Sequence, residues 1–350
     1  MTLGELGEDA LLRELQSRFP PSASVPVGIG DDAAVVAFPS GENALLTTDS
    51  LVEGTHFTLG TVPARFVGRK SVAVSASDVA AMGGEARAAL LSLVVPFDLE
   101  VSTFWQIIDG AAERCGELAM VLVGGNVARS RGPVVVDVTA MGSTVSGRTL
   151  VRSAARPGET LFVSGSIGGA SCGLHLLESG VRLSVEGRLV VPEDLRSGPV
   201  EAAEACVRAQ IDPTPRLGLG RALNEASLAS ACIDISDGLS VDLHRLCRAS
   251  GVSARVDEPR LPISAETLAW ERERKRDAAA AALGGGEDYE LLFTSRDDAA
   301  VRAVGESLQI PLTPIGVIVE DPGETRVSIV SSDGSERPLA ARGWDHFRRD

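Results

Sequence analysis

The sequence predicts an α/β protein with two domains. Segments with the apolar pattern of strands alternate with segments of helical period along most of the chain, which is typical of α/β proteins. This alternation lapses around residues 145–156 and starts again at Pro157-Gly158. With 350 residues, the chain is long enough for two domains that each bury a core. We therefore expect one domain over residues 1–149 and another over residues 150–350.

The elements of the first domain follow from periodicity and breakers. Leu11, Leu12 and Leu15 recur at helical spacing, and Pro20-Pro21 ends that helix. Short apolar runs between turn residues predict strands, and longer runs with apolar residues every three to four positions predict helices. The expected order is a helix at residues 8–19, strands at 25–29, 33–38 and 44–48, a helix at 63–82, a strand at 88–95, a helix at 101–118, and strands at 120–123 and 134–141.

The second domain repeats the alternation. A Gly/Ser-rich segment at residues 165–173 leads into a helix, and a charge cluster at 271–277 indicates a solvated helical face. The alternation alone does not separate a doubly wound sheet from an α+β arrangement. The expected elements are strands at 160–164, 231–235, 289–294 and 313–319, and helices at 238–249, 264–283 and 299–308.

Composition and charge narrow the classes of function. Apolar residues make up 44% of the chain and charged residues 23%, which is typical of globular proteins. The net charge of −15 argues against nucleic acid as the main partner, because phosphate backbones are bound by clustered Lys and Arg. No apolar run approaches the ~20 residues that span a bilayer, and no signal segment is recognisable. Five scattered cysteines without a CxxC pair indicate reduced thiols, so we expect a cytoplasmic protein without a membrane partner.

One acidic stretch stands out near the start of the chain. Asp31 and Asp32 follow a glycine pair, and Asp49 follows a short apolar run with His56 close behind. Two like charges about 4 Å apart repel by about 4 kcal/mol at an effective dielectric near 20, so such groups must take up protons or bind cations. Oxygen ligands of this kind suit Mg²⁺. The stretch predicts a magnesium site for the phosphates of a nucleotide, and hence a small-molecule kinase; a turn with solvated aspartates is the alternative.

Three better-known nucleotide motifs do not fit. Gly28-Ile29-Gly30 is followed by two carboxylates, which would repel a pyrophosphate, and a strand is expected where a dinucleotide fold needs a helix. Gly68-Arg69-Lys70-Ser71 lacks the leading glycine of a P-loop, since position 63 is proline. His244-Arg245-Leu246 lacks the catalytic aspartate of protein kinases.

Further acidic residues lie at the ends of expected elements. Asp78 is placed among small apolar residues on a helix, where it is either exposed or costly to bury. Asp234 ends an apolar strand, which is difficult to explain by solvation. Ser236 and Asp237 follow at the turn into a helix, where either could be a helix N-cap.

Two segments near the C-terminus also combine candidate ligands with a plain alternative. Glu287, Asp288 and Glu290 follow three glycines at the entry to a buried strand, where they bind a ligand or are simply solvated. Trp344 lies in an aromatic-poor chain and either packs the tail or offers a stacking face for a flat ligand.

Taken together, the motifs resemble the thiamine-monophosphate kinase family, a member of the superfamily of aminoimidazole ribonucleotide synthetase. The resemblance spans nearly the whole chain. It rests on Ile29-Gly30-Asp31-Asp32-Ala33, Thr47-Thr48-Asp49, Glu53-Gly54-Thr55-His56-Phe57, Ser77-Asp78-Val79-Ala80-Ala81-Met82-Gly83, Gly124-Gly125-Asn126, Ile233-Asp234-Ile235-Ser236-Asp237-Gly238-Leu239, Gly285-Gly286-Glu287-Asp288-Tyr289-Glu290-Leu291 and Gly343-Trp344-Asp345-His346-Phe347.

The resemblance implies an α+β type of fold in two domains, with the N-terminal domain binding ATP and magnesium and dimerising through its sheet. It implies transfer of the γ-phosphoryl group of ATP to thiamine phosphate, with several Mg²⁺ ions and no catalytic residue beyond the metal and substrate ligands. The implied metal ligands are Asp32, Thr47, Thr48, Asp49, Asp78, Asn126, Asp234 and Asp237. Gly125, Asn126, Arg152 and Ser236 are the implied ATP contacts, and His56, Glu287 and Trp344 the implied contacts to thiamine phosphate.

The sequence departs from the family pattern at Asn126, where the family commonly has an aspartate. An amide keeps an oxygen donor but loses a charge, so we expect one Mg²⁺ ion to bind more weakly. The rival interpretations are siblings of the superfamily and an inactive nucleotide-binding homologue. Selenophosphate synthetases carry a reactive cysteine and a lysine near the N-terminus, whereas the first of each here are Cys115 and Lys70; the hydrogenase-maturation relatives end in a cysteine, whereas this sequence ends in Asp350.

Overall fold

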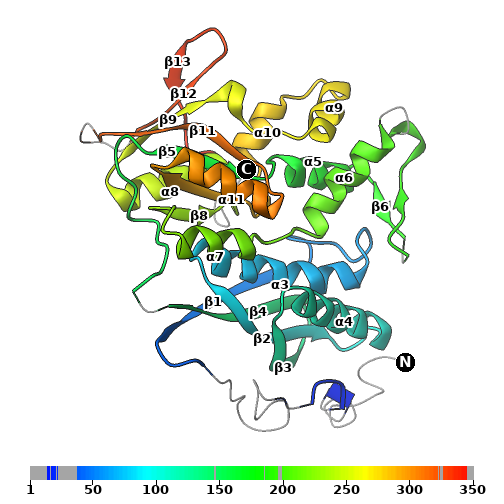
Figure 1. Cartoon of the computed structure of the whole chain (residues 1–350). Helices are drawn as coiled ribbons and strands as arrows, with labels where there is room; N and C mark the ends of the chain where they lie inside the picture. Colours follow the sequence, from blue (N-terminus) through cyan, green and yellow to red (C-terminus); the bar gives the residue numbers. More distant parts are fainter. Residues whose placement is uncertain are drawn as a thin grey trace. The chain divides into compact units, whose positions relative to one another are not determined.

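The computed structural model describes residues 14, 15, 17–20, 22, 38–145, 147–184, 186–195, 199–321, 323 and 326–344. Two compact units form (Figure 1): unit 1 consists of Met1–Val79, Glu85–Gly147 and Arg182–Val190, and unit 2 of Ala80–Gly84, Arg148–Val181 and Val191–Asp350. The expected strand at 25–29, Asp31 and Asp32 lie outside the described residues, as does all but Phe38 of the expected strand at 33–38.

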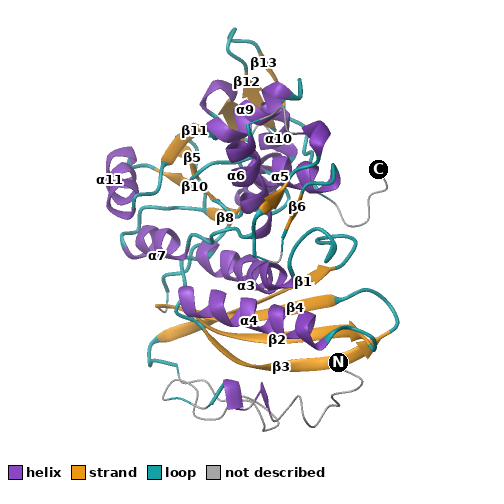
Figure 2. Cartoon of the chain, turned by 90° about the vertical axis from the view of Figure 1, so that its right-hand side faces the viewer, coloured by secondary structure: helices purple, strands orange, loops and turns teal. Residues whose placement is uncertain are grey.

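Unit 1 is built on a four-stranded sheet of order β1-β4-β2-β3. The β1–β4 and β2–β4 pairs are antiparallel and only β2–β3 is parallel, which confirms the α+β type of fold. Helices α3 and α4 cover one face of this sheet (Figure 2). The bounds are β1 (Glu42–Val52), α3 (Ala64–Ala81), β2 (Glu85–Pro96), α4 (Val101–Glu117), β3 (Val121–Ser130), β4 (Val135–Val145) and the small hairpin β6 (Arg182–Leu183) and β7 (Leu189–Val190).

Two glycines let α3 and α4 pack backbone against backbone. A Cβ atom at Gly68 would lie 1.9 Å from the Ile107 carbonyl oxygen, and one at Gly110 would lie 1.9 Å from the Arg65 carbonyl oxygen. Both positions therefore require glycine. The segment that superficially resembled a P-loop is thus the interior of α3, and its glycine serves helix packing.

Strand β3 is longer than expected. The prediction ended this strand at residue 123, but it continues through Gly124-Gly125-Asn126 to Ser130. A Cβ atom at Gly125 would lie 1.8 Å from the Leu91 carbonyl oxygen, so the glycine permits a close approach of β2. The prediction that the strand ends at the glycines is therefore wrong.

Unit 2 contains a seven-stranded sheet of order β13-β12-β9-β11-β5-β10-β8, in which only β12 and β9 run parallel. Its strands are β5 (Thr160–Ser164), β8 (Cys232–Asp234), β9 (Ser253–Asp257), β10 (Leu291–Ser295), β11 (Leu312–Val319), β12 (Val327–Val330) and β13 (Glu336–Pro338). Its helices are α5 (Gly169–Glu178), α6 (Val200–Ile211), α7 (Leu217–Glu225), α8 (Leu239–Ser250), α9 (Ala265–Glu273), α10 (Ala278–Gly284) and α11 (Asp298–Leu308), with 3₁₀ turns at Glu193–Leu195 and Glu258–Arg260.

Both faces of the central strands of unit 2 are buried. Leu161 and Val163 of β5 belong to the cluster that includes residues of α8 and α10, whereas Phe162 belongs to the cluster formed with α7 and α11. Phe162 stacks on Phe293 of β10 with ring centroids 5.4 Å apart. Burial on both faces explains why these strands are continuous apolar runs in the sequence.

Most expected elements are confirmed, with β5 matching its predicted bounds, but one helix is wrong. The expected helix at 264–283 is two helices, α9 and α10. Lys275 has a left-handed backbone with φ of 54°, and the Asp277 side chain accepts a hydrogen bond of 3.0 Å from the Ala279 N–H, which starts α10. Helices α6 and α7 and strands β9, β12 and β13 were not predicted. Among the described residues, no helix is both long and apolar enough to cross a membrane.

Candidate functional site

In unit 1, two predicted metal ligands on β1, Thr47 and Asp49, lie close to another predicted ligand, Asp78, on α3. Thr47 and Asp49 lie two positions apart and share the face of the sheet that α3 covers. The Thr47 hydroxyl donates a hydrogen bond to Asp78 Oδ2, and the Ser75 hydroxyl donates one of 2.8 Å to Asp49 Oδ2. We call Thr47, Asp49, Ser75 and Asp78 the α3 acidic group.

The α3 acidic group concentrates negative charge in a poorly solvated place. Burial and the charge of Asp78 raise the pKa of Asp49 to about 6, although the Ser75 hydroxyl acts in the opposite direction. Both causes disfavour the ionised carboxylate and would be relieved by a bound cation. The group therefore has the electrostatics of a cation site.

The donors of the α3 acidic group fit Mg²⁺, since all of them are hard oxygen atoms. Mg²⁺ is commonly held by one or two carboxylates, with phosphate oxygens and waters completing an octahedron. Within the part of the chain that the structure describes, no three His, Cys, Asp or Glu side chains gather closely enough to hold a metal by themselves. The group thus supplies two carboxylates, and Asp32 lies outside the described residues.

Thr48 and Asn126 lie on the other face of this sheet. The Thr48 hydroxyl accepts a hydrogen bond of 3.1 Å from Thr139. Asn126 is exposed and pairs in register with Ser92. Since β1 and β3 are the two edges of a four-stranded sheet, these side chains stand about 14 Å apart, which is too far for one ion within one chain. The structure does not bring them together with Asp49 and Asp78.

His56 follows the end of β1 in a tight turn. Its Nδ1 accepts a hydrogen bond of 3.0 Å from the Val52 N–H, and the backbone N–H of His56 donates one of 2.8 Å to the Val52 carbonyl. Gly54, with φ of 84°, provides the left-handed position of the turn. In the neutral imidazole the proton therefore resides on Nε2.

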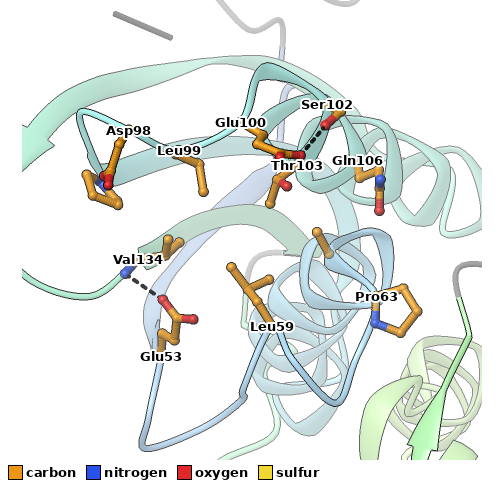
Figure 3. A pocket seen from close by; sticks show the side chains of 12 residues that line it. Glu53, Leu59, Pro63, Asp98, Leu99, Glu100, Ser102, Thr103, Gln106 and Val134 are labelled. Atoms are coloured by element: carbon orange, nitrogen blue, oxygen red, sulfur yellow. Dashed lines mark hydrogen bonds between the residues drawn. The ribbon is translucent and has the colours of Figure 1, made fainter. Parts of the chain in front are cut away.

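Unit 1 also has a pocket of about 560 Å³ at the end of β1 and the start of α4 (Figure 3). Three carboxylates line it, and Glu53 accepts a hydrogen bond of 3.1 Å from the Val134 N–H. No predicted site residue lines this pocket, and its acidic lining does not suit phosphates. The lining residues are Glu53, Leu59, Pro63, Ala64, Pro96, Asp98, Leu99, Glu100, Ser102, Thr103, Gln106 and Val134.

In unit 2, the turn after β8 is organised by an acid that the sequence did not single out. The buried Asp242 carboxylate accepts hydrogen bonds of 3.1 Å from the N–H groups of both Ser236 and Asp237. Arg245 donates to Asp242 at 2.7 Å and to Asp237 at 2.5 Å. Burial raises the pKa of Asp242 to about 6, although Arg245 favours its charged form. Asp242 and Arg245 together fix the turn that carries Ser236 and Asp237.

The helix N-cap alternative for this turn is wrong. Helix α8 begins after Gly238, which has φ of 117°, and no side chain caps it. Asp234, at the end of β8, is only 2% exposed. Arg152 is exposed, and its carbonyl accepts a hydrogen bond of 2.7 Å from the Ser250 hydroxyl.

Two distant segments run beside this turn. The Glu287 N–H donates to the Ser236 carbonyl at 2.8 Å, and the Trp344 N–H donates to the Asp237 carbonyl at 3.0 Å. A Cβ atom at Gly343 would lie 2.2 Å from the Asp237 carbonyl oxygen, so only glycine permits this approach of the tail. The structure thus brings four predicted site residues of unit 2 together: Ser236, Asp237, Glu287 and Trp344.

The loop at residues 284–290 gives its three acids different partners. Glu287 accepts a hydrogen bond from Gln210 Nε2. Asp288 accepts bonds of 2.7 and 3.2 Å from the N–H groups of residues 168 and 170 at the start of α5, and burial raises its pKa to about 7. Glu290 is paired with the Arg216 guanidinium, whose Nε lies 2.6 Å from Oε2. Asp288 and Glu290 therefore stabilise the position of this loop through their bonds to α5 and Arg216. Glu287 is the candidate ligand among the three acids.

Known proteins resemble this chain over nearly its whole length. The family model described as AIR synthase related protein, N-terminal domain, matches residues 30–144, and the model of the C-terminal domain matches residues 156–328. The thiamine-monophosphate kinase of Escherichia coli (strain K12) is 33% identical over 344 residues, covering 97% of this chain and 98% of that protein.

Two solved structures have the same architecture. The thiamine-monophosphate kinase from Stenotrophomonas maltophilia K279a matches with a TM-score of 0.77 and 35% identity, covering 93% of this chain and 96% of that one. AaThiL complexed with AMPPCP and TMP matches with a TM-score of 0.73 and 33% identity, covering 99% of both chains. The chain therefore belongs to the thiamine-monophosphate kinase family, among the AIR synthase related proteins.

Proposed function

We infer that this protein phosphorylates thiamine phosphate to thiamine diphosphate with ATP. The observation that carries the inference is the match, over 99% of both chains, to a relative that holds AMPPCP and TMP. The acceptor in this reaction is a phosphate oxygen that is already anionic, so the enzyme needs no strong general base. The main obstacle is the approach of two polyanions, and positioning and charge compensation overcome it.

We propose that Mg²⁺ ions bind to oxygen ligands of both units. Bound Mg²⁺ neutralises phosphate charge and stabilises the charge that develops during in-line transfer. The α3 acidic group supports this proposal, because its two neighbouring carboxylates and the raised pKa of Asp49 favour a cation there. The proposed ligands are Asp32, Thr47, Thr48, Asp49, Asp78, Asn126, Asp234 and Asp237.

For the nucleotide, we propose contacts from Gly125, Asn126, Arg152 and Ser236. Ser236 has the clearest structural support, since Asp242 fixes the backbone of its turn through two hydrogen bonds. A rigid turn at the end of a buried strand can hold a phosphate without losing conformational entropy at each turnover.

For thiamine phosphate, we propose contacts from His56, Glu287 and Trp344. The carboxylate of Glu287 suits a substrate with an amino group and a cationic ring. Trp344 is 46% exposed, and an aromatic face contributes about 1–2 kcal/mol to binding of a cationic thiazolium. The hydrogen bond from its backbone N–H to the Asp237 carbonyl supports a role for Trp344 near the Ser236 turn.

We propose that residues 1–149 act as the ATP- and Mg²⁺-binding domain and dimerise through the sheet, with residues 150–350 as the second domain. Leu46 is 72% exposed on the face of the sheet away from α3 and α4, and Leu90 is 42% exposed. Apolar side chains on such a face favour a second copy of this chain as the partner. The five cysteines are unpaired and buried, which supports a cytoplasmic location.

The test of the function is a turnover assay. Purified protein with ATP, MgCl₂ and thiamine phosphate should form ADP and thiamine diphosphate in equal amounts, and EDTA should stop the reaction. Formation of ADP without thiamine diphosphate, or neither product despite ATP binding, would contradict the proposal.

A further inference from the structure

Glu287 has an unusual backbone and a defined side-chain partner. Its φ of 69° lies in the left-handed region, which is uncommon for a residue with a side chain and is often found at functional sites. Its N–H is tied to the Ser236 carbonyl, and its carboxylate accepts a hydrogen bond from Gln210 of α6. The surrounding structure therefore determines both the backbone and the side chain of this residue.

The Gln210 side chain is buried, and only part of its hydrogen-bonding capacity is used by the described residues. It is only 2% exposed. A carboxylate can only accept hydrogen bonds, so the amide must direct Nε2 toward Glu287, which fixes the orientation of Oε1. Within the described residues, Oε1 has no hydrogen-bond partner. Burying a half-satisfied amide costs stability, so packing does not explain a glutamine at this position.

Close packing of α5 against α6 fixes the backbone and the Cβ atom of Gln210. A Cβ atom at Gly173 of α5 would lie 2.1 Å from the Cys206 carbonyl oxygen and 2.9 Å from Gln210 Cβ, so α5 and α6 pack backbone against backbone. Asp288, the neighbour of Glu287, accepts two hydrogen bonds from the first turn of α5. The loop that carries Glu287 and the helix that carries Gln210 are thus anchored to the same helix.

We propose that Gln210 is a positioning residue that fixes the direction of the Glu287 carboxylate for recognition of the amino-bearing, cationic part of the substrate. This inference rests on the proposed function, in which Glu287 binds thiamine phosphate. An amide is suited to this role because it orients the carboxylate by a hydrogen bond without adding a positive charge, whereas Arg216 neutralises Glu290 on the same loop.

The first test compares Gln210→Met with Val207→Ala, a substitution of another buried residue of α6. Gln210→Met should raise the KM for thiamine phosphate about tenfold while kcat and the KM for ATP change less than about twofold. Val207→Ala should lower the unfolding temperature and leave all three constants unchanged. An unchanged KM for thiamine phosphate in Gln210→Met, or an equal rise in both KM values, would overturn the proposal.

The second test is a double-mutant cycle with Glu287→Gln. If Gln210 acts through Glu287, adding Gln210→Met to Glu287→Gln should cause no further loss of affinity for thiamine phosphate. Independent, multiplicative losses overturn the positioning role. Affinities are measured by calorimetry with thiamine phosphate, so the cycle remains informative even if the wild-type protein forms no thiamine diphosphate, a result that would count against the proposed function alone.

Discussion

Ser75 of α3 donates a hydrogen bond of 2.8 Å to Asp49 Oδ2 on β1, and Asp78 lies one helical turn further along α3. The hydroxyl holds the Asp49 carboxylate, while burial and the charge of the neighbouring Asp78 raise its pKa to about 6. Such an arrangement is unfavourable in the absence of a cation and favourable in its presence. It defines the part of unit 1 on which the proposed chemistry depends.

Asp49→Asn should remove activity without harming the fold. We expect kcat to fall by at least about 100-fold, the scale for loss of a preorganised electrostatic contact. The unfolding free energy should stay constant or rise by about 1 kcal/mol, because the substitution removes a poorly solvated charge beside Asp78. Initial rates and thermal unfolding provide the measurements. Asp98→Asn is the matched control, since it removes an exposed acid of the same unit, and near-normal turnover by Asp49→Asn would exclude Asp49 from the metal site.

Thr47→Val and Thr48→Val should differ although the two residues are adjacent. Thr47 donates to Asp78 on the α3 face, whereas the Thr48 side chain contacts Thr139 on the other face. We expect Thr47→Val to lower kcat about tenfold or more. Thr48→Val should change kcat at saturating Mg²⁺ less than about threefold but should raise the Mg²⁺ concentration needed for half-maximal activity, because its proposed ion lies on the other face of the sheet. Steady-state rates at saturating substrates test this, and equal effects would contradict the assignment of the Thr47 side chain to the metal site.

Asn126→Asp should lower the concentration of Mg²⁺ needed for half-maximal activity, because a carboxylate adds a charge to an oxygen ligand. Asn126 lies on the sheet face opposite Asp49, so it would serve a different ion from the α3 acidic group. The rate of the variant should therefore exceed that of wild type even when Mg²⁺ saturates the α3 acidic group but not the second ion. Magnesium titrations of the rate measure it. A requirement that is unchanged or higher in the variant would count against Asn126 as a metal ligand.

Gly343→Ala should displace the C-terminal tail. The new Cβ atom would lie 2.2 Å from the Asp237 carbonyl oxygen and 2.6 Å from Val241 Cγ2. Because the Trp344 N–H bonds to the same carbonyl, we expect the KM for thiamine phosphate to rise about three- to tenfold. Gly218→Ala is the control, since a Cβ atom there meets nothing within 4 Å. If Gly343→Ala and Gly218→Ala gave the same KM, the tail would have no part in substrate binding.

Asp288→Asn should change how stability depends on pH. The pKa of Asp288 is raised from 3.8 to about 7, so the folded state binds the proton more tightly than the unfolded state does. Its contribution to stability is therefore fully present below about pH 4 and is lost as the pH rises toward 7. Between pH 4.5 and pH 8, the unfolding free energy of Asp288→Asn should therefore rise by about 1–3 kcal/mol relative to that of wild type. Denaturant unfolding at both pH values measures this difference, and a pH-independent difference would show that Asp288 does not titrate in this range.

Much of the architecture could be predicted because it follows from local patterns of apolar residues and breakers in the sequence. The bounds of β5 follow from a continuous apolar run after Pro157-Gly158, a pattern that a strand buried on both faces requires. The break between α9 and α10 was missed because the alanines after Asp277 extend a helical period, whereas the new start at α10 depends on one capping side chain. Local propensity does not decide between a continuous helix and a capped restart.

The candidate ligands could be predicted in part, and their supporting residues could not. Asp49 and Asp78 were identified from motifs, but the pairing of Asp49 with Ser75 depends on how β1 packs under α3. Asp242 resembles an ordinary acid in the first turn of a helix, and only the fold shows that it holds the Ser236 turn. Gln210 has no sequence signal, since its partner Glu287 is 77 residues away.

The most direct measurement follows the labelled phosphoryl group. With γ-³²P-labelled ATP, Mg²⁺ and thiamine phosphate, the label should appear at the terminal phosphate of thiamine diphosphate, and Asp49→Asn should give at most about 1% of that rate. Label released only as inorganic phosphate, or equal transfer by wild type and variant, would contradict the account.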